Sequence, residues 1–164
     1  MNLVQTILRG LQFLWTILIM SLIGNMLAHK GNHSVVNYDM FVAAFAMLSL
    51  LYLIPSAIKE NLTVHPALNI VLDVLNTIFF FCGGVATASY LRVHSCSDRH
   101  YLDHNSVSVG SEKVCREGQA STAFLWFGFA CWAASIFFSF MSGRGSANLR
   151  GPSSRRGGPS MSQV

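Results

Sequence analysis

One carboxylate, Asp73, stands inside an apolar stretch that runs from residue 67 to residue 91. A charged group at membrane depth is costly and usually faces other protein groups or water. Asn69 and Asn76 lie four residues before and three residues after it, so the three side chains share one helix face. This face is expected to point into a helix bundle, where the amides can hydrogen-bond the acid. The functional interpretation is a proton, ion or lipid-headgroup site; we favour the structural one, a polar clasp between helices.

Histidines and cysteines gather in the polar segment from Arg92 to Gln119. Cys96 and Cys115 can pair with each other if the segment lies in an oxidising compartment. Together with His94, His100 and His104 they could instead bind zinc. The spacing His94-x-Cys96 is not that of an ordinary zinc finger. We therefore favour a disulfide over a zinc site or free thiols, and we expect no cofactor.

The segment from Ser142 to Val164 is rich in Gly, Ser, Pro and Arg, a composition typical of disordered tails. Cationic side chains near an anionic leaflet attract it by roughly 1 kcal/mol each. Phosphorylation of the serines beside two of these arginines would cancel that attraction; the alternative is a soluble tail with incidental serines. The candidate residues are Arg144, Arg150, Arg155 and Arg156 for contact with the leaflet or a scaffold, and Ser153 and Ser154 for phosphorylation.

The elements that must position these groups are four apolar runs. The chain is 52% hydrophobic and only 11% charged, well below the roughly one-quarter charged residues of soluble domains. Runs of 18 or more apolar residues are long enough to cross a bilayer as helices, and solid runs argue against a β-barrel. We predict an all-α integral membrane four-helix bundle over residues 1–141, with a disordered tail at 142–164. The expected spans are 11–28, 40–58, 67–91 and 120–141.

Basic residues suggest how the bundle is oriented. The N-terminus, middle loop and tail are basic, whereas acids offset the basic residues of the other two loops. Because Arg and Lys favour the cytoplasmic side, we expect both termini in the cytoplasm. The first run is expected to be a retained helix, since no small-x-small cleavage site follows it. We find no phosphate-binding glycine loop and no nucleophile elbow, and expect neither enzymatic activity nor a nucleic-acid partner.

Five short motifs occur along the chain: Val36-Asn37-Tyr38-x-Met40-Phe41, Leu72-Asp73-x-Leu75-Asn76, His94-Ser95-Cys96, Cys115-Arg116-x-x-Gln119-Ala120-x-x-Ala123-Phe124-Leu125 and Ser162-Gln163-Val164. They resemble those of fungal MARVEL-domain proteins of the non-classical export protein 2 type, and the resemblance covers essentially the whole chain. The entry to the fourth span is the most specific of them. Glu117 is a departure, since a less acidic residue is expected there.

The resemblance implies a MARVEL-like, four-span plasma-membrane protein with both termini inside. It also implies an association with sterol- and sphingolipid-rich furrow domains, the eisosomes, and with unconventional protein secretion. The resulting hypothesis is a non-enzymatic organiser of lateral membrane domains. Its expected partners are membrane lipids, cytoplasmic eisosome-type scaffold proteins and further copies of itself. The alternative hypothesis is a small transporter or channel that uses Asp73.

Overall fold

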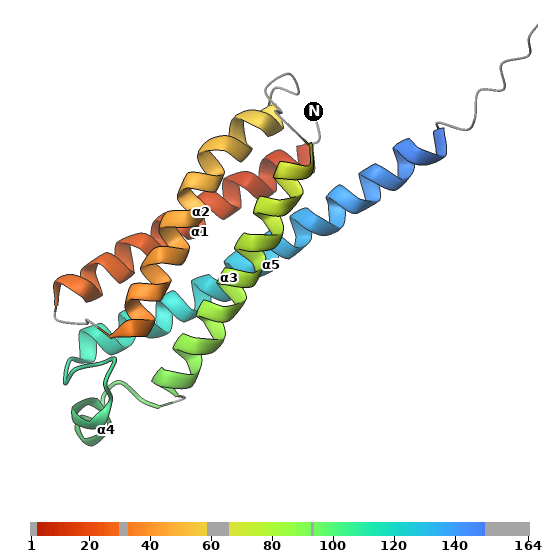
Figure 1. Cartoon of the computed structure of the whole chain (residues 1–164). Helices are drawn as coiled ribbons and strands as arrows, with labels where there is room; N and C mark the ends of the chain where they lie inside the picture. The colour runs from red at the N-terminus through yellow and green to blue at the C-terminus, as the bar shows by residue number, and fades with distance from the viewer. Residues whose placement is uncertain (1–2, 30–32, 59–65, 93, 150–164) are drawn as a thin grey trace, which may run out of the picture.

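The structure is a computed structural model that describes residues 3–29, 33–58, 66–92 and 94–149, without the side chains of Pro66 and of residues 142–149. Every regular element in these ranges is a helix, and no strand occurs among them. The helices are α1 (Leu3–Ala28), α2 (Ser34–Ile58), α3 (Pro66–Leu91), α4 (Arg99–His104) and α5 (Glu112–Leu149), as Figure 1 shows. All except α4 are long and apolar enough to cross a membrane, which confirms the predicted fold class.

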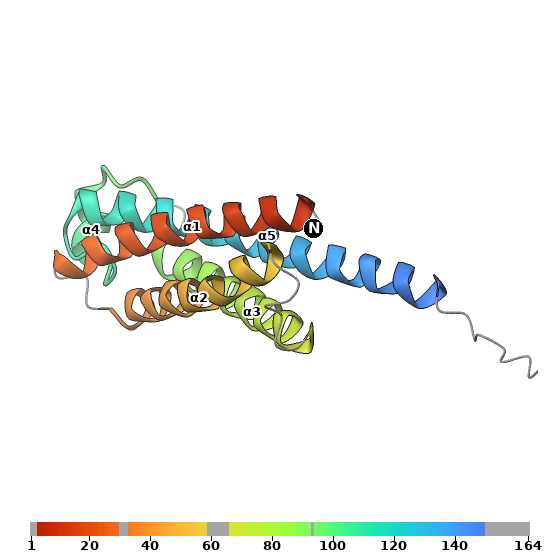
Figure 2. The same ribbon diagram turned by 90° about the horizontal axis from the view of Figure 1, so that it is seen from above.

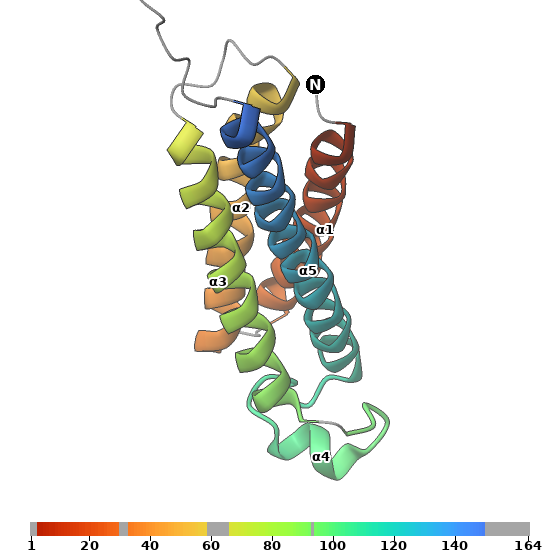
Figure 3. The same ribbon diagram turned by 90° about the vertical axis from the view of Figure 1, so that its right-hand side faces the viewer.

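The four long helices form a ring. α1 packs against α2 and α5, and α3 packs against the same two helices. α1 and α3 therefore lie diagonally across the bundle, as Figure 3 shows. α4 and its loop lie at one end, here called the disulfide end (Figure 1). α1 begins and α5 ends at the opposite end, here called the terminal end, where α5 extends beyond the other helices (Figure 2).

Apolar side chains occupy both the inside and the outside of the ring. Ile19, Leu50, Phe80, Leu125 and Trp132 are fully buried between the helices. The outer faces also carry large apolar groups, which a soluble protein would rarely expose in such numbers. These outward groups include Leu48, Leu51, Phe127, Phe137 and Phe140. Such a surface fits a hydrocarbon environment, in which exposing apolar side chains costs no free energy.

Glycines allow α3 and α5 to approach closely. A Cβ atom on Gly128 of α5 would lie within 2.5 Å of Cδ1 of the buried Phe80 on α3. A Cβ atom on Gly83 of α3 would lie 2.8 Å from Oδ1 of Asp39 on α2. Small residues at these crossings are a common device for packing membrane helices.

The helices are longer than the sequence analysis predicted. α1 begins at Leu3 rather than at residue 11, and α2 begins at Ser34 rather than at residue 40. The predicted starts avoided Arg9 and Asp39, but both side chains are buried inside the bundle, where Arg9 pairs with Asp73 and Asp39 accepts a hydrogen bond from Thr87. Their charges therefore do not end the helices.

α5 extends past both ends of its predicted span. It begins at Glu112, where an ion pair from Arg116 to Glu112 (2.5 Å) supports its first turns. It continues to Leu149, so the assignment of residues 142–149 to a disordered tail is wrong. Extending an established helix costs much less than nucleating one. The rest of the tail, residues 150–164, lies outside the described residues.

Candidate functional site

A buried ion pair joins the two diagonal helices. Nη1 of Arg9 on α1 donates to Oδ1 of Asp73 on α3 at 2.5 Å, and Nη2 donates to Oδ2 at 2.8 Å. Both side chains are almost completely buried. The arrangement is the bidentate pairing that the planar guanidinium and carboxylate groups favour. The carboxylate noticed in the sequence therefore has a cationic partner on another helix, a residue that lies just before the first predicted span.

Gln12 of α1 and two side chains of α5 extend this pair. Arg9 also donates to Oε1 of Gln12 (3.0 Å), and Nε2 of Gln12 donates to Oγ of Ser135 (2.9 Å). The guanidinium carbon of Arg9 lies 5.6 Å from the ring centroid of Trp132, within the range of a cation–π interaction. Arg9, Gln12, Asp73, Trp132 and Ser135 are called the polar core below. It links α1, α3 and α5 in the half of the bundle nearest the terminal end.

The two asparagines do not bond the acid, so that part of the predicted cluster is wrong. Asn76 is fully buried and donates to Oγ of Ser49 on α2 (3.0 Å) and to the Leu72 carbonyl (2.8 Å). Asn69 is half-buried, and its side-chain oxygen has no hydrogen-bond partner within the described part of the chain. Because Asp73 is occupied by Arg9, Asn76 serves a separate contact between α2 and α3.

Two further acids, both outside the predicted spans, lie near the disulfide end: Asp39 is buried and Glu117 is partly buried. Asp39 on α2 accepts a hydrogen bond from Thr87 on α3 at 2.5 Å. Glu117 on α5 accepts one from Asn25 on α1. Each contact joins two neighbouring helices of the ring. The sequence did not indicate these two contacts, because each acid lies just before a continuous apolar run rather than inside it.

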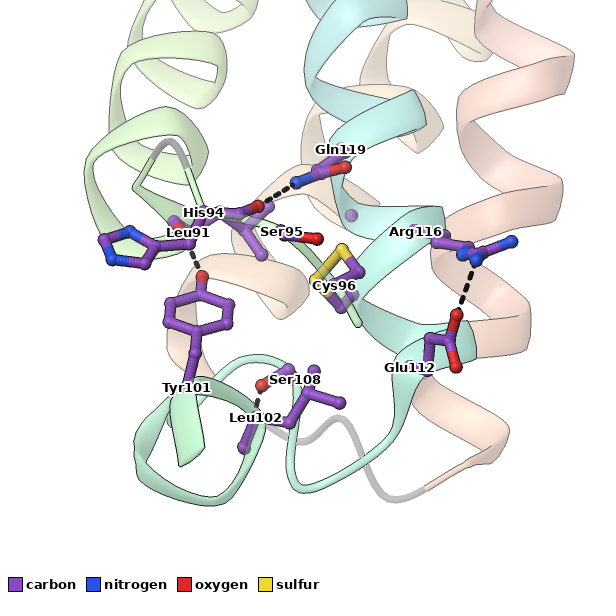
Figure 4. The surroundings of a disulfide bond; sticks show 12 residues. Leu91, His94, Ser95, Cys96, Tyr101, Leu102, Ser108, Glu112, Arg116 and Gln119 are labelled. Carbon is purple, nitrogen blue, oxygen red and sulfur yellow. Dashed lines mark hydrogen bonds and ion pairs between the residues drawn. A yellow bond between two sulfur atoms is a disulfide. The ribbon is translucent and has the colours of Figure 1, made fainter. Parts of the chain in front are cut away.

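The two loop cysteines are joined in the structure. Cys96 and Cys115 form a disulfide with a Cα–Cα distance of 5.8 Å, which ties the loop after α3 to the first turn of α5 (Figure 4). Leu102 of α4 packs against the bridge. Cys82 and Cys131 are free thiols within α3 and α5. The described residues contain no group of three or more His, Cys, Asp or Glu side chains placed to hold a metal ion.

Side chains of the loop cap the end of α3. The hydroxyl of Tyr101 donates to the Leu91 carbonyl, and Nδ2 of Asn105 donates to the Tyr90 carbonyl at 2.9 Å (Figure 4 shows the first). Burial raises the pKa of Tyr101, so its hydroxyl stays protonated as a donor. Gln119 of α5 donates to the His94 carbonyl at 3.0 Å. The loop is therefore a folded cap rather than a loose connection.

The tail candidates are not placed. The side chain of Arg144 is not among those described, although its backbone belongs to α5. Arg150, Ser153, Ser154, Arg155 and Arg156 lie outside the described residues.

Loss of the disulfide is expected to destabilise this cap. The bridge spans a sequence separation of 19 residues, and closing a loop of that size stabilises a fold by about 3 kcal/mol in the chain-entropy estimate. Thermal unfolding of the purified protein in detergent, with and without a reductant, measures this effect. Replacing both Cys96 and Cys115 with Ser should lower the melting temperature and abolish the response to reductant. The control, Cys82→Ser with Cys131→Ser, should keep that response; a melting temperature indifferent to reductant in the unmodified protein would contradict the prediction.

The buried polar groups, the apolar exterior and the four long helices together define a multi-pass integral membrane protein with a disulfide-linked cap at one end. α1 begins and α5 ends at the other end of the bundle.

Comparison with known proteins places the chain more narrowly. Residues 2–138 match the membrane-associating domain called MARVEL, and the chain belongs to this family. It is 34% identical to non-classical export protein 2 of Saccharomyces cerevisiae over 99% of this chain and 98% of the relative. It is 36% identical to non-classical export protein 102 of Candida albicans over 98% of this chain and 97% of the relative. No solved structure matches the chain significantly.

Proposed function

We propose that this protein is a non-enzymatic organiser of lateral domains in the plasma membrane. The observation that carries the proposal is that charged side chains of the spans are bonded inside the bundle, while its outer surface is apolar. Within the spans, the charged groups Arg9, Asp39 and Asp73 bond one another or neighbouring helices, whereas large apolar groups cover the outside. Such a bundle meets the bilayer through shape and packing, which are the means by which a membrane protein selects lipids and associates with copies of itself.

The finer parts of the proposal rest on the family and on the tail. We place the protein in sterol- and sphingolipid-rich eisosome-type furrows, with both termini in the cytoplasm. The basic tail then contacts the inner leaflet and cytoplasmic scaffold proteins, because clustered arginines are attracted to anionic surfaces. The names of the two relatives add a role in unconventional protein export.

Live imaging tests the proposal. The tagged full-length protein is expressed in a fungal cell and followed before and after sphingolipid synthesis is blocked. The expected result is stable plasma-membrane patches that disperse or rearrange on the block. A variant with the tail arginines at 150, 155 and 156 changed to Gln should still reach the membrane but form fewer patches. An even distribution, or residence in internal membranes with no response, would refute the proposal.

The second candidate is a small transporter or channel. It gains support from the polar core, because buried polar side chains from several helices meet around Asp73. Against it, both oxygens of Asp73 are occupied by Arg9, so a transported cation would have to displace the guanidinium. The test is ion flux into proteoliposomes containing the unmodified protein or the double variant Arg9→Gln with Asp73→Asn. Flux that requires the two charges would favour this candidate, whereas no flux, or equal flux, would dismiss it.

A further inference from the structure

A polar cavity of about 640 Å³ opens at the disulfide end, between the last turn of α3 and the face of α4. It has no role in the domain-organiser proposal as argued so far. Its walls combine one carboxylate, that of Asp98, with one arginine, three histidines and two hydrogen-bonding side chains that already cap α3. These residues are Arg92, His94, His100, Tyr101, His104 and Asn105.

Arg92 supplies the permanent positive charge of this cavity. It follows the last residue of α3 with a φ of 49°, and its backbone N–H bonds the Ala88 carbonyl at 3.0 Å. The backbone of Arg92 therefore ends the helix. Its guanidinium forms no ion pair with any acid in the described part of the chain. An unpaired guanidinium in a concave site is available to bind an anion with two parallel hydrogen bonds.

The histidines are held in place by their neighbours. The His94 ring stacks on Tyr101 with centroids 4.8 Å apart, and the His100 and His104 rings stack at 4.5 Å. Nδ1 of His104 lies 2.9 Å from the carbonyl oxygen of His100, and this hydrogen bond also fixes the orientation of the His104 ring. The N–H of His104 is taken up by that carbonyl, so the imidazoles of His94 and His100 are the rings that can add N–H donors to those of Arg92.

One acid, Asp98, also lines the cavity. Oδ1 of Asp98 accepts hydrogen bonds from the backbone N–H groups of His100 (3.0 Å) and Tyr101 (3.4 Å), as the N-cap of α4. The carbonyls of Tyr90 and Leu91, which would give the end of α3 a negative potential, accept from Asn105 and Tyr101. The guanidinium of Arg92 and the imidazoles of His94 and His100 are therefore left to donate to a ligand, and the carboxylate of Asp98 is the one negative side chain among the lining residues.

We propose that this cavity binds the phosphate group of a membrane lipid from the leaflet at the disulfide end. Ser89 and Tyr90 in its wall belong to the last turn of a membrane-spanning helix, so the cavity opens at the depth of lipid headgroups. This inference deepens the proposed function by naming the chemical group of the lipid that the protein recognises.

The test measures lipid binding directly. Full-length protein is purified in dodecyl maltoside, a detergent without phosphate, and bound lipids are counted by native mass spectrometry. The probes are dioctanoyl phosphatidate, dioctanoylglycerol with the same chains but no phosphate, and inorganic phosphate. Arg92→Gln removes the cation, and Arg92→Lys keeps the charge without the planar fork. Arg99→Gln is the matched control, because Arg99 lines the neighbouring cavity on α4 instead.

The unmodified protein and Arg99→Gln should bind phosphatidate in preference to dioctanoylglycerol. Arg92→Gln should weaken phosphatidate binding about tenfold, with Arg92→Lys in between. All variants must keep the melting temperature of the unmodified protein. Equal binding of the two lipids, or no loss in Arg92→Gln, would overturn the proposal. Inorganic phosphate that binds as tightly as phosphatidate would assign the cavity to free phosphate instead. The assay uses no cells, so its failure leaves the imaging result for the domain organiser standing, and the reverse also holds.

Discussion

Replacing Asp73 with Asn is expected to unfold or strongly destabilise the protein. The change leaves the guanidinium of Arg9 buried between helices without its carboxylate partner. Breaking a buried ion pair by removing one member typically costs about 3–5 kcal/mol, because the remaining charge is desolvated and uncompensated. The measurement is the melting temperature of purified protein in detergent, together with the amount of monodisperse protein recovered from membranes.

A second change should restore most of the loss. With Arg9→Gln added to Asp73→Asn, the core holds two neutral amides that can hydrogen-bond each other and Gln12. The single variant Arg9→Gln should be damaging as well, since it strands the carboxylate. As a control, Arg116→Gln breaks an exposed pair with Glu112, and its cost should be below about 1 kcal/mol. If Asp73→Asn alone were as stable as the unmodified protein, the ion pair would not hold α1 to α3.

The architecture could be predicted from the sequence, because lipid imposes a simple rule on it. A helix that crosses the bilayer needs a long apolar run, and each of the four runs is visible without knowledge of its neighbours. The oxidised pair of cysteines was also foreseeable, since only two of the four cysteines lie outside the predicted spans.

The polar core could not be predicted in the same way. Arg9 and Asp73 are 64 residues apart, so no local spacing signals their contact. Arg9 precedes the first continuous apolar run and was read as a flanking cytoplasmic charge. A signal did exist: a lone acid in a span requires a partner, and Arg9 is followed three residues later by Gln12 on the same helix face. The cavity at the disulfide end left no signal, because it depends on how α4 folds back onto α3.

Gly128→Ala is expected to destabilise the bundle although alanine is the better helix former. The new methyl group would lie within 2.5 Å of the Phe80 ring, which is fully buried and close to Trp132 (ring centroids 6.2 Å apart). α3 and α5 would have to separate, or the ring would have to leave its rotamer. Overpacking of this kind costs about 1–3 kcal/mol and should exceed the gain in helix propensity of up to about 1 kcal/mol. Thermal unfolding in detergent measures the balance.

A glycine-to-alanine substitution at another position separates the cost of overpacking from the gain in helix propensity. A Cβ atom on Gly24 of α1 would meet nothing within 4 Å, so Gly24→Ala should be neutral or stabilising. Shrinking the opposing ring should rescue the damaged variant: Phe80→Leu is destabilising alone, but it should cost much less when Gly128→Ala is already present. Additive effects of the two changes would show that the methyl group and the ring do not collide. A coupling of 1 kcal/mol or more (about a fivefold change in the unfolding constant) would instead place the closest approach of α3 and α5 at this glycine.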